Sequence, residues 1–173
     1  MSLFKYISFT FSLLFCITIG ISQPGTTWQC TGPNLFPTDI SGQINGIGRV
    51  SQLKFHPTNP LKMYAVSASG GLWVSTDSAS TWIKTGSDNI PATACASVCI
   101  DYTDDNIIYL GTGDANYYGG DFGIWKSTDA GATFTQSTTG LGNLLPIEIL
   151  MSPTNNSILV TATNNGIYRS TNA

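Results

Sequence analysis

Three short segments place a carboxylate or an amide among small polar residues. Asp129 lies in KSTDAGATF (126–134), Asp77 in GGLWVSTDSASTW (70–82) and Asn172 in NGIYRSTNA (165–173). An isolated acid in such a setting could transfer a proton or bind Ca2+. An amide accepts the same hydrogen bonds but cannot act as a general acid or base. Because the position recurs and tolerates asparagine, we expect it to shape a turn rather than to catalyse a reaction.

These segments belong to a longer repeat. Each follows an apolar stretch, a polar turn and a second apolar stretch, in LKFHPTNPLKMYAVSAS (53–69), VCIDYTDDNIIYLGTGD (98–114) and IEILMSPTNNSILVTAT (147–163). When His56, Asp101 and Ser152 are taken as equivalent, the spacings are 45 and 51 residues. A repeat of this length without helical periodicity indicates the blades of a β-propeller.

Each repeat is expected to hold up to four short strands, because Val, Ile, Leu, Tyr and Trp fill the stretches between Asn, Pro, Gly and Asp. The predicted strands lie near 50–55, 62–67, 71–76 and 81–85, then near 95–101, 107–112, 122–127 and 133–136, and finally near 147–151, 158–163 and 166–170. No helix is expected after the N-terminal apolar segment. The predicted fold is all-β, an incomplete propeller of four-stranded antiparallel blades near 50–90, 91–140 and 141–173.

The number of blades raises the question of closure. About three blades are expected here, whereas propellers usually close with 4–8. We therefore expect the chain to be the N-terminal part of a longer protein that supplies the remaining propeller blades. The alternative is a ring assembled from several copies.

The N-terminal segment predicts export. Lys5 precedes an apolar run of about 15 residues, and Gly20 and Ser22 fit a cleavage before Gln23, which is the pattern of a secretory signal peptide. We expect residues 1–22 to be this peptide and 23–49 to lead into the propeller. The mature protein would be secreted or held at the cell surface, with no membrane span after cleavage.

Composition excludes several partners and cofactors. The net charge is −3 and only 10% of residues are charged, which argues against nucleic-acid binding. His56 is the single histidine and no Cys-x2-Cys pair occurs, so no metal site is expected. On one strand, Cys95 and Cys99 would lie about 13 Å apart, beyond the reach of a disulfide. Either could pair with Cys30, or all three could be free thiols.

The repeated segments resemble the Asp-box, or BNR repeat, Ser-x-Asp-x-Gly-x-Thr-Trp/Phe. This motif is typical of sialidases, xyloglucan-cleaving hydrolases, sortilin-type receptors and many secreted bacterial propellers. The matching residues are Ser75, Asp77, Thr81 and Trp82, then Ser127, Asp129, Gly131, Thr133 and Phe134, and finally Ser170 and Asn172. The resemblance covers about 42–173 and implies a hairpin turn between the third and fourth strands of each blade. Ala79 stands where glycine is usual and would cost roughly 1 kcal/mol if its φ is positive.

The catalytic residues of two enzyme classes with this motif can be compared with this sequence. A sialidase site needs three arginines, and only Arg49 and Arg169 occur. In YAVSASGGLW (64–73), which is similar to a stretch of the xyloglucan hydrolases, their catalytic aspartate would fall on Ala68. No catalytic residue is therefore assigned.

One loop departs from the repeat. The distance from Asp101 to Asp129 is 28 residues, against 21 from His56 to Asp77, and the extra residues lie in GDANYYGGDF (113–122). The resemblance implies that this loop opens on the face opposite the Asp-box turns. The candidate ligand-binding residues are Asp114, Asn116, Tyr117, Tyr118 and Asp121. Tyrosine rings stack on sugars, and carboxylates and amides hold hydroxyl groups or Ca2+. The alternative is a solvated loop whose tyrosines pack on a neighbouring blade.

Two functions follow from these patterns. The first is a secreted, non-catalytic module that binds glycan or an extracellular protein, with no cofactor or, as an alternative, Ca2+. The second is a glycoside hydrolase, similar to a xyloglucanase or sialidase, whose acids lie partly in other blades.

Overall fold

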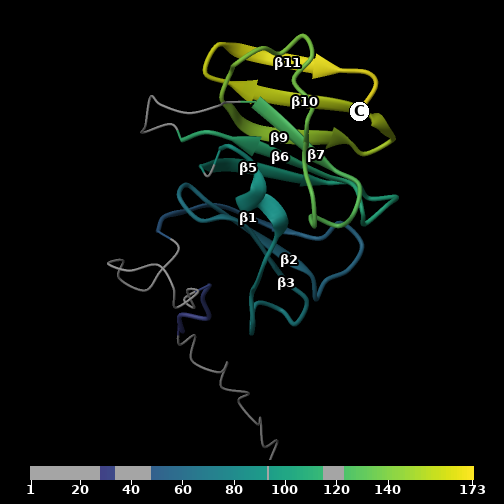
Figure 1. Ribbon diagram of the computed structural model, residues 1–173. Coiled ribbons are helices and arrows are strands. Elements are labelled where there is room, and N and C mark those ends of the chain that lie inside the picture. Colours follow the sequence, from purple (N-terminus) through teal and green to yellow (C-terminus); the bar gives the residue numbers. More distant parts are fainter. Residues whose placement is uncertain (1–27, 34–47, 93, 115–122) are drawn as a thin grey trace, which may run out of the picture. The chain divides into compact units, whose positions relative to one another are not determined.

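The computed structural model describes residues 28–33, 48–92, 94–114 and 123–173 (Figure 1). The chain divides into two compact units, Met1–Cys30 and Thr31–Ala173, and the sheets lie in the second unit. The predicted signal peptide, 1–22, lies outside the described residues, as does most of the predicted 23–49 segment. Within the described part of the chain, no helix has the length and apolar character needed to span a membrane.

The second unit consists of three antiparallel sheets, each formed by consecutive strands. The first holds β1 (Val50–Phe55), β2 (Met63–Ser67), β3 (Gly71–Ser75) and β4 (Ile83–Lys84). The second holds β5 (Cys95–Ile100), β6 (Ile108–Thr112), β7 (Gly123–Ser127) and β8 (Thr135–Gln136). The third holds β9 (Pro146–Ser152), β10 (Asn155–Thr163) and β11 (Gly166–Ser170), in the order β11-β10-β9. These sheets confirm the all-β fold with its four-stranded antiparallel blades.

One short element was not predicted. A single turn of 3-10 helix, η1, covers Gly86–Asn89. Thr85 caps it by accepting a hydrogen bond from the Ser87 N–H, and the buried Ser87 hydroxyl accepts the Leu72 N–H at 2.9 Å. The turn therefore depends on contacts with β3, which strand and helix propensities do not reveal.

The core lies between successive sheets, which follow one another as blue, teal-green and yellow layers in Figure 1. Between the first two sheets, Tyr64 and Leu72 pack with Val98, Ile108 and other apolar side chains. Between the second and third sheets, the packed residues are Cys99, Tyr109, Ile124, Ile149 and Leu159. Alternate residues of β6 thus serve the two interfaces, which explains why Ile108, Tyr109 and Leu110 are all buried.

Polar contacts also join consecutive sheets at equivalent positions. His56 Nε2 lies 2.8 Å from Asp105 Oδ1, while His56 Nδ1 accepts the N–H groups of Thr58 and Asn59. In the next repeat, the Asn156 amide donates to Asp101 Oδ2 at 3.0 Å. Asp101 is almost fully buried; burial opposes its ionisation, but its hydrogen bonds outweigh that effect and lower its pKa. In both cases the residue directly after the first strand of one sheet meets a residue of the following sheet, Asp105 in the turn before β6 and Asn156 near the start of β10.

Candidate functional site

The segments that resemble the Asp-box form two closely similar turns, between β3 and β4 and between β7 and β8. Asp77 accepts the Thr81 N–H at 2.8 Å and the Thr81 hydroxyl at 2.6 Å. Asp129 accepts the same two groups of Thr133, at 2.8 and 2.5 Å. The hydrogen bonds from Thr133, and then that from Ser127, lower the pKa of Asp129 to about 2, and equivalent bonds lower the pKa of Asp77. Both carboxylates are therefore engaged in holding their own turns.

The turns also need a left-handed backbone. Ser78 and Ala79 have φ of 58° and 67°, and their counterparts Ala130 and Gly131 have φ of 58° and 89°. Ser75 Oγ accepts the Ala79 N–H and Ser127 Oγ accepts the Gly131 N–H, each at 2.9 Å. Ala79 thus has a positive φ, which is the case in which the sequence predicts a cost of roughly 1 kcal/mol.

The aromatic residues that end the two turns pack inside the protein. Phe134 is partly buried against the core between the first and second sheets. Trp82 packs with Ala65 and Trp73. In the third repeat, the Ser170 hydroxyl donates to Asn172 Oδ1 at 3.0 Å, which reproduces the start of the turn with an amide. Asn172 thus supplies one acceptor oxygen, to the Ser170 hydroxyl, whereas Asp77 and Asp129 also accept a threonine hydroxyl at their second carboxylate oxygen.

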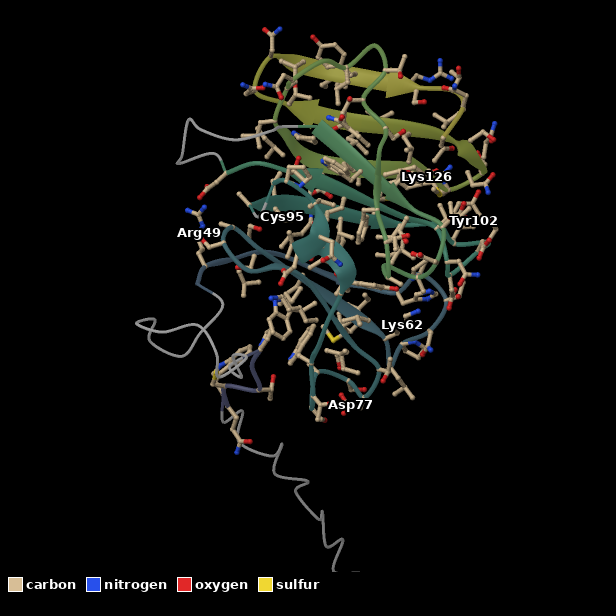
Figure 2. The ribbon with its side chains drawn as sticks, in the orientation of Figure 1. Arg49, Lys62, Asp77, Cys95, Tyr102 and Lys126 are labelled. Atoms are coloured by element: carbon tan, nitrogen blue, oxygen red, sulfur yellow. The ribbon has the colours of Figure 1, made fainter. Side chains whose placement is uncertain are left out.

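A hollow lies at the opposite end of the strands. The turns follow the ends of β3 and β7, whereas this hollow surrounds the beginnings of β1, β5 and β9. It has a volume of about 300 Å3. The lining residues are Arg49, Val50, Ser51, Ala68, Cys95, Ala96, Gly113, Asp114, Leu145 and Ile147. In Figure 2, Arg49 and Cys95 lie toward the left of the sheets, and Lys62, Tyr102 and Lys126 lie toward the right, near the other ends of the strands.

The hollow is built from equivalent positions of the three repeats. The pairing register slips by one residue at Ser51 in β1, at Ala96 in β5 and at Ile147 in β9. Such β-bulges bend a strand and redirect its side chains, and they are frequent beside functional sites. All three bulged residues line the hollow. The repeat therefore brings together one bulge from each sheet.

An ion pair supplies the charge at this site. The guanidinium group of Arg49, just before β1, hydrogen-bonds to the carboxylate of Asp114, just after β6. The Arg49 side chain is 49% exposed and the Asp114 side chain is 16% exposed. The Arg49 carbonyl also accepts the Ala68 N–H at 3.1 Å, which fixes this end of β1 against β2. An exposed guanidinium beside a mostly buried carboxylate presents both donors and acceptors to a ligand.

The structure places the predicted ligand-binding residues unevenly. Asp114 lies in the hollow, whereas Asn116, Tyr117, Tyr118 and Asp121 lie outside the described residues. Sequence reasoning did not assign Arg49 to the site. Arg49, Ala94 and Leu145 each lie directly before the first strand of a repeat. This equivalence was the signal in the sequence that could have drawn attention to Arg49. The repeat places Arg49 at this end of the sheets, but its partner becomes visible only when the first two sheets are packed together.

Metal-binding groups are few. Among residues 28–33, 48–92, 94–114 and 123–173, no cluster of three or more His, Cys, Asp or Glu side chains could hold a metal ion. Cys30 is exposed, Cys95 and Cys99 are buried, and all three are free. Burial raises the pKa of Cys95 to about 12 and that of Cys99 to about 11, which disfavours their thiolates.

Comparison with solved structures identifies the architecture. The crystal structure of an ancestral GH74 enzyme and that of the GH74 xyloglucanase from Xanthomonas campestris each match with a TM-score of 0.55 and 20% identity. The fold is a β-propeller. Each match covers 72% of this chain, but only 17% of the ancestral enzyme and 20% of the xyloglucanase. No family model matches the sequence, and no curated protein matches it. The chain thus spans about a fifth of the solved proteins that it resembles.

Proposed function

We propose that this chain is part of a secreted propeller of the Asp-box type that binds glycan, without cleaving it, at the hollow beside Arg49 and Asp114. The observation that carries the proposal is the ion pair of these two residues at the point where three β-bulges meet. The hollow lies opposite the Asp-box turns, so turn formation and ligand binding use different ends of the sheets.

The chemistry of the hollow suits a sugar. A guanidinium group offers several N–H donors in one plane and a carboxylate accepts from hydroxyl groups, which together match neighbouring sugar hydroxyls. Val50, Leu145 and Ile147 add an apolar lining on which a sugar ring can rest.

The number of carboxylates in the hollow favours binding without hydrolysis. Glycoside hydrolysis generally needs two carboxyl groups, roughly 5–9.5 Å apart. Asp114 is the one carboxylate that lines the hollow within the described part of the chain, and Arg49 engages it. Ala68, at the position that matches the catalytic aspartate of the xyloglucan hydrolases, lies in the same lining and carries no acid.

A second candidate is a glycoside hydrolase whose catalytic acids come partly from further blades. The supporting observation is that both solved proteins described above are GH74 enzymes by their titles. The likeness at 20% identity supports this candidate through the fold alone.

Affinity electrophoresis of the full-length protein in gels with xyloglucan, mixed-linkage glucan or cellulose derivatives tests binding, and release of reducing sugar tests cleavage. We expect retardation without sugar release, and loss of retardation in Arg49→Ala and Asp114→Asn. Lys84→Ala and Asp104→Asn remove one basic and one acidic side chain outside the hollow and should leave retardation unchanged. Sugar release that Asp114→Asn abolishes would favour the hydrolase, and retardation that all four variants retain would reject this binding site.

A further inference from the structure

The turn between β10 and β11 places an exposed asparagine directly before a glycine. Thr163 and Gly166 pair across the hairpin, so Asn164 and Asn165 form a two-residue turn. Asn165 is exposed. Ser69, in the corresponding turn between β2 and β3, is exposed as well, although the second sheet packs against these two strands. Exposure is therefore a property of this turn in the repeat.

The backbone requires glycine after Asn165. Gly71, Gly123 and Gly166 each begin the third strand of a repeat, with φ of 70°, 139° and 108°. A residue with a Cβ atom disfavours such a conformation, whereas glycine adopts it readily. The fold thus fixes a residue at 166 whose main-chain nitrogen is not shielded by a side chain.

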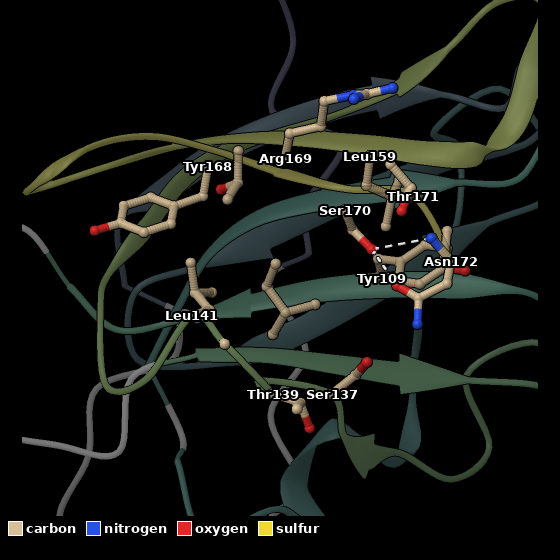
Figure 3. A pocket seen from close by; sticks show the side chains of 14 residues that line it. Tyr109, Ser137, Thr139, Leu141, Leu159, Tyr168, Arg169, Ser170, Thr171 and Asn172 are labelled. Atoms are coloured by element: carbon tan, nitrogen blue, oxygen red, sulfur yellow. Dashed lines mark hydrogen bonds between the residues drawn. The ribbon is translucent and has the colours of Figure 1, made fainter.

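The side chain of Asn165 is also less restrained than those of other asparagines in this sheet. Asn156 donates its amide to Asp101 Oδ2 at 3.0 Å. Asn172 Oδ1 accepts the Ser170 hydroxyl at 3.0 Å (Figure 3). In the described part of the chain, Asn165 is instead held through its main-chain N–H. Its side-chain amide can therefore turn toward the nitrogen of the following glycine.

We propose that Asn165 is a deamidation site, at which the side-chain amide reacts with the main-chain nitrogen of Gly166 to form a cyclic imide. The Gly166 nitrogen gives up its proton to base and forms a bond to Asn165 Cγ. The bond from Cγ to the amide nitrogen breaks, and this nitrogen takes up a proton and leaves as ammonia. Water then opens the ring at either carbonyl carbon, which gives aspartate or isoaspartate. The reaction consumes only water, so no oxidant or reductant takes part.

The attack requires the turn to open, because Gly166 is paired with Thr163 in the folded hairpin. Opening of a hairpin end costs much less free energy than unfolding of the whole protein. The modification can therefore proceed in the folded chain.

Isoaspartate at this position alters the wall of the hollow beside Arg49. In isoaspartate the main chain runs through the former side chain, so the two-residue turn becomes longer by one carbon atom. Asn164 Oδ1 accepts the Leu145 N–H at 3.1 Å, and Leu145 lines the hollow. A longer turn moves Asn164 away from Leu145. Deamidation itself does not depend on glycan binding, although its effect reaches the surface proposed for it.

The test is incubation of the full-length protein at pH 8, followed by peptide mapping with tandem mass spectrometry and by enzymatic methylation, which labels isoaspartate. We expect the mass shift from amide to acid at Asn165, with the isoaspartate label on the same peptide. Asn164 should shift much less, because the residue after it carries a Cβ atom, and Asn156 should not shift, because its amide is held. The other Asn-Gly pair of the sequence, Asn45-Gly46, lies outside the described residues and is mapped on a separate peptide.

Substitutions at Asn165 provide matched controls. Asn165→Ser introduces the residue found in the turn of the first repeat and should abolish both the mass shift and the label. Freshly purified Asn165→Asp carries the new charge without the longer main chain. Amide hydrogen exchange at Leu145, followed by NMR, should be faster in the isoaspartyl protein and unchanged in Asn165→Asp.

An unchanged mass at Asn165, or equal shifts at Asn164 and Asn165, would overturn the proposal. A mass shift without the isoaspartate label would also overturn it, because direct hydrolysis of the amide gives aspartate alone. Unchanged hydrogen exchange at Leu145 in the isoaspartyl protein would overturn the effect on the hollow.

Discussion

Replacing Ala79 by glycine should stabilise the protein, because this residue is held in a conformation that its side chain disfavours. Ala79 has φ of 67° in the turn between β3 and β4. Gly131 occupies the same position in the turn between β7 and β8, with φ of 89°. The two turns share the same hydrogen bonds, so the presence of a Cβ atom is the main difference at this position.

The magnitude follows from two opposing terms. A left-handed backbone costs a residue with a Cβ atom about 1–2 kcal/mol. Glycine recovers that cost but adds about 0.4–1 kcal/mol of conformational entropy to the unfolded chain. The free energy of unfolding should therefore rise by about 1 kcal/mol in Ala79→Gly, and the midpoint of thermal unfolding by about 2–4 °C for a chain of this size.

The reverse substitution provides a matched control. A Cβ atom on Gly131 would lie 3.5 Å from the Thr85 side chain and 3.6 Å from Ile108 Cδ1, which is ordinary contact. Gly131→Ala should thus lose about 1 kcal/mol through its backbone alone. Both variants can be measured by urea unfolding followed by circular dichroism. The reasoning is refuted if Ala79→Gly is neutral or destabilising while Gly131→Ala costs nothing.

Three further predictions concern charge, packing and reactivity. Asp129 has a pKa of about 2 when folded, below its unfolded value, so its turn stabilises the fold above about pH 4 and loses this contribution as the pH falls toward 2; Asp129→Asn should flatten stability over that range in acid titrations. Asn156→Ala should lower the free energy of unfolding by about 1.5–3 kcal/mol in urea, because the buried Asp101 carboxylate loses a donor, and a loss below 0.5 kcal/mol would contradict that role. At pH 8, iodoacetamide should modify the exposed Cys30 well before Cys95, whose pKa is raised to about 12 by burial; mass spectrometry of timed samples that finds equal rates would contradict the buried position.

Local features of the fold were predicted well from the sequence. The predicted strand at 50–55 coincides with β1, and those at 71–76 and 166–170 agree with β3 and β11 within a residue. These elements follow from alternating apolar residues bounded by Gly, Asn and Asp. The least regular element, η1, was missed because a contact between Ser87 and β3 stabilises it.

The candidate site was predicted only in part. The length of the loop after β6 pointed to Asp114, but the role of Arg49 depends on two residues 65 positions apart in the sequence. A charge without a recognisable local motif gives no sign of its partner. Likewise, the hollow beside Arg49 exists because the sheets pack together, and strand propensity says nothing about that packing.

The sequence by itself determined the repeat, the strands and the turns that follow β3 and β7. Each turn is closed by hydrogen bonds within four residues, which Thr81 donates to Asp77 and Thr133 donates to Asp129, so residue types at fixed spacing are sufficient to specify it. Only the tertiary structure decided the pairing of Arg49 with Asp114 and the hollow that the bulges of β1, β5 and β9 line. These depend on how one twisted sheet packs on the next, which brings together residues from different repeats.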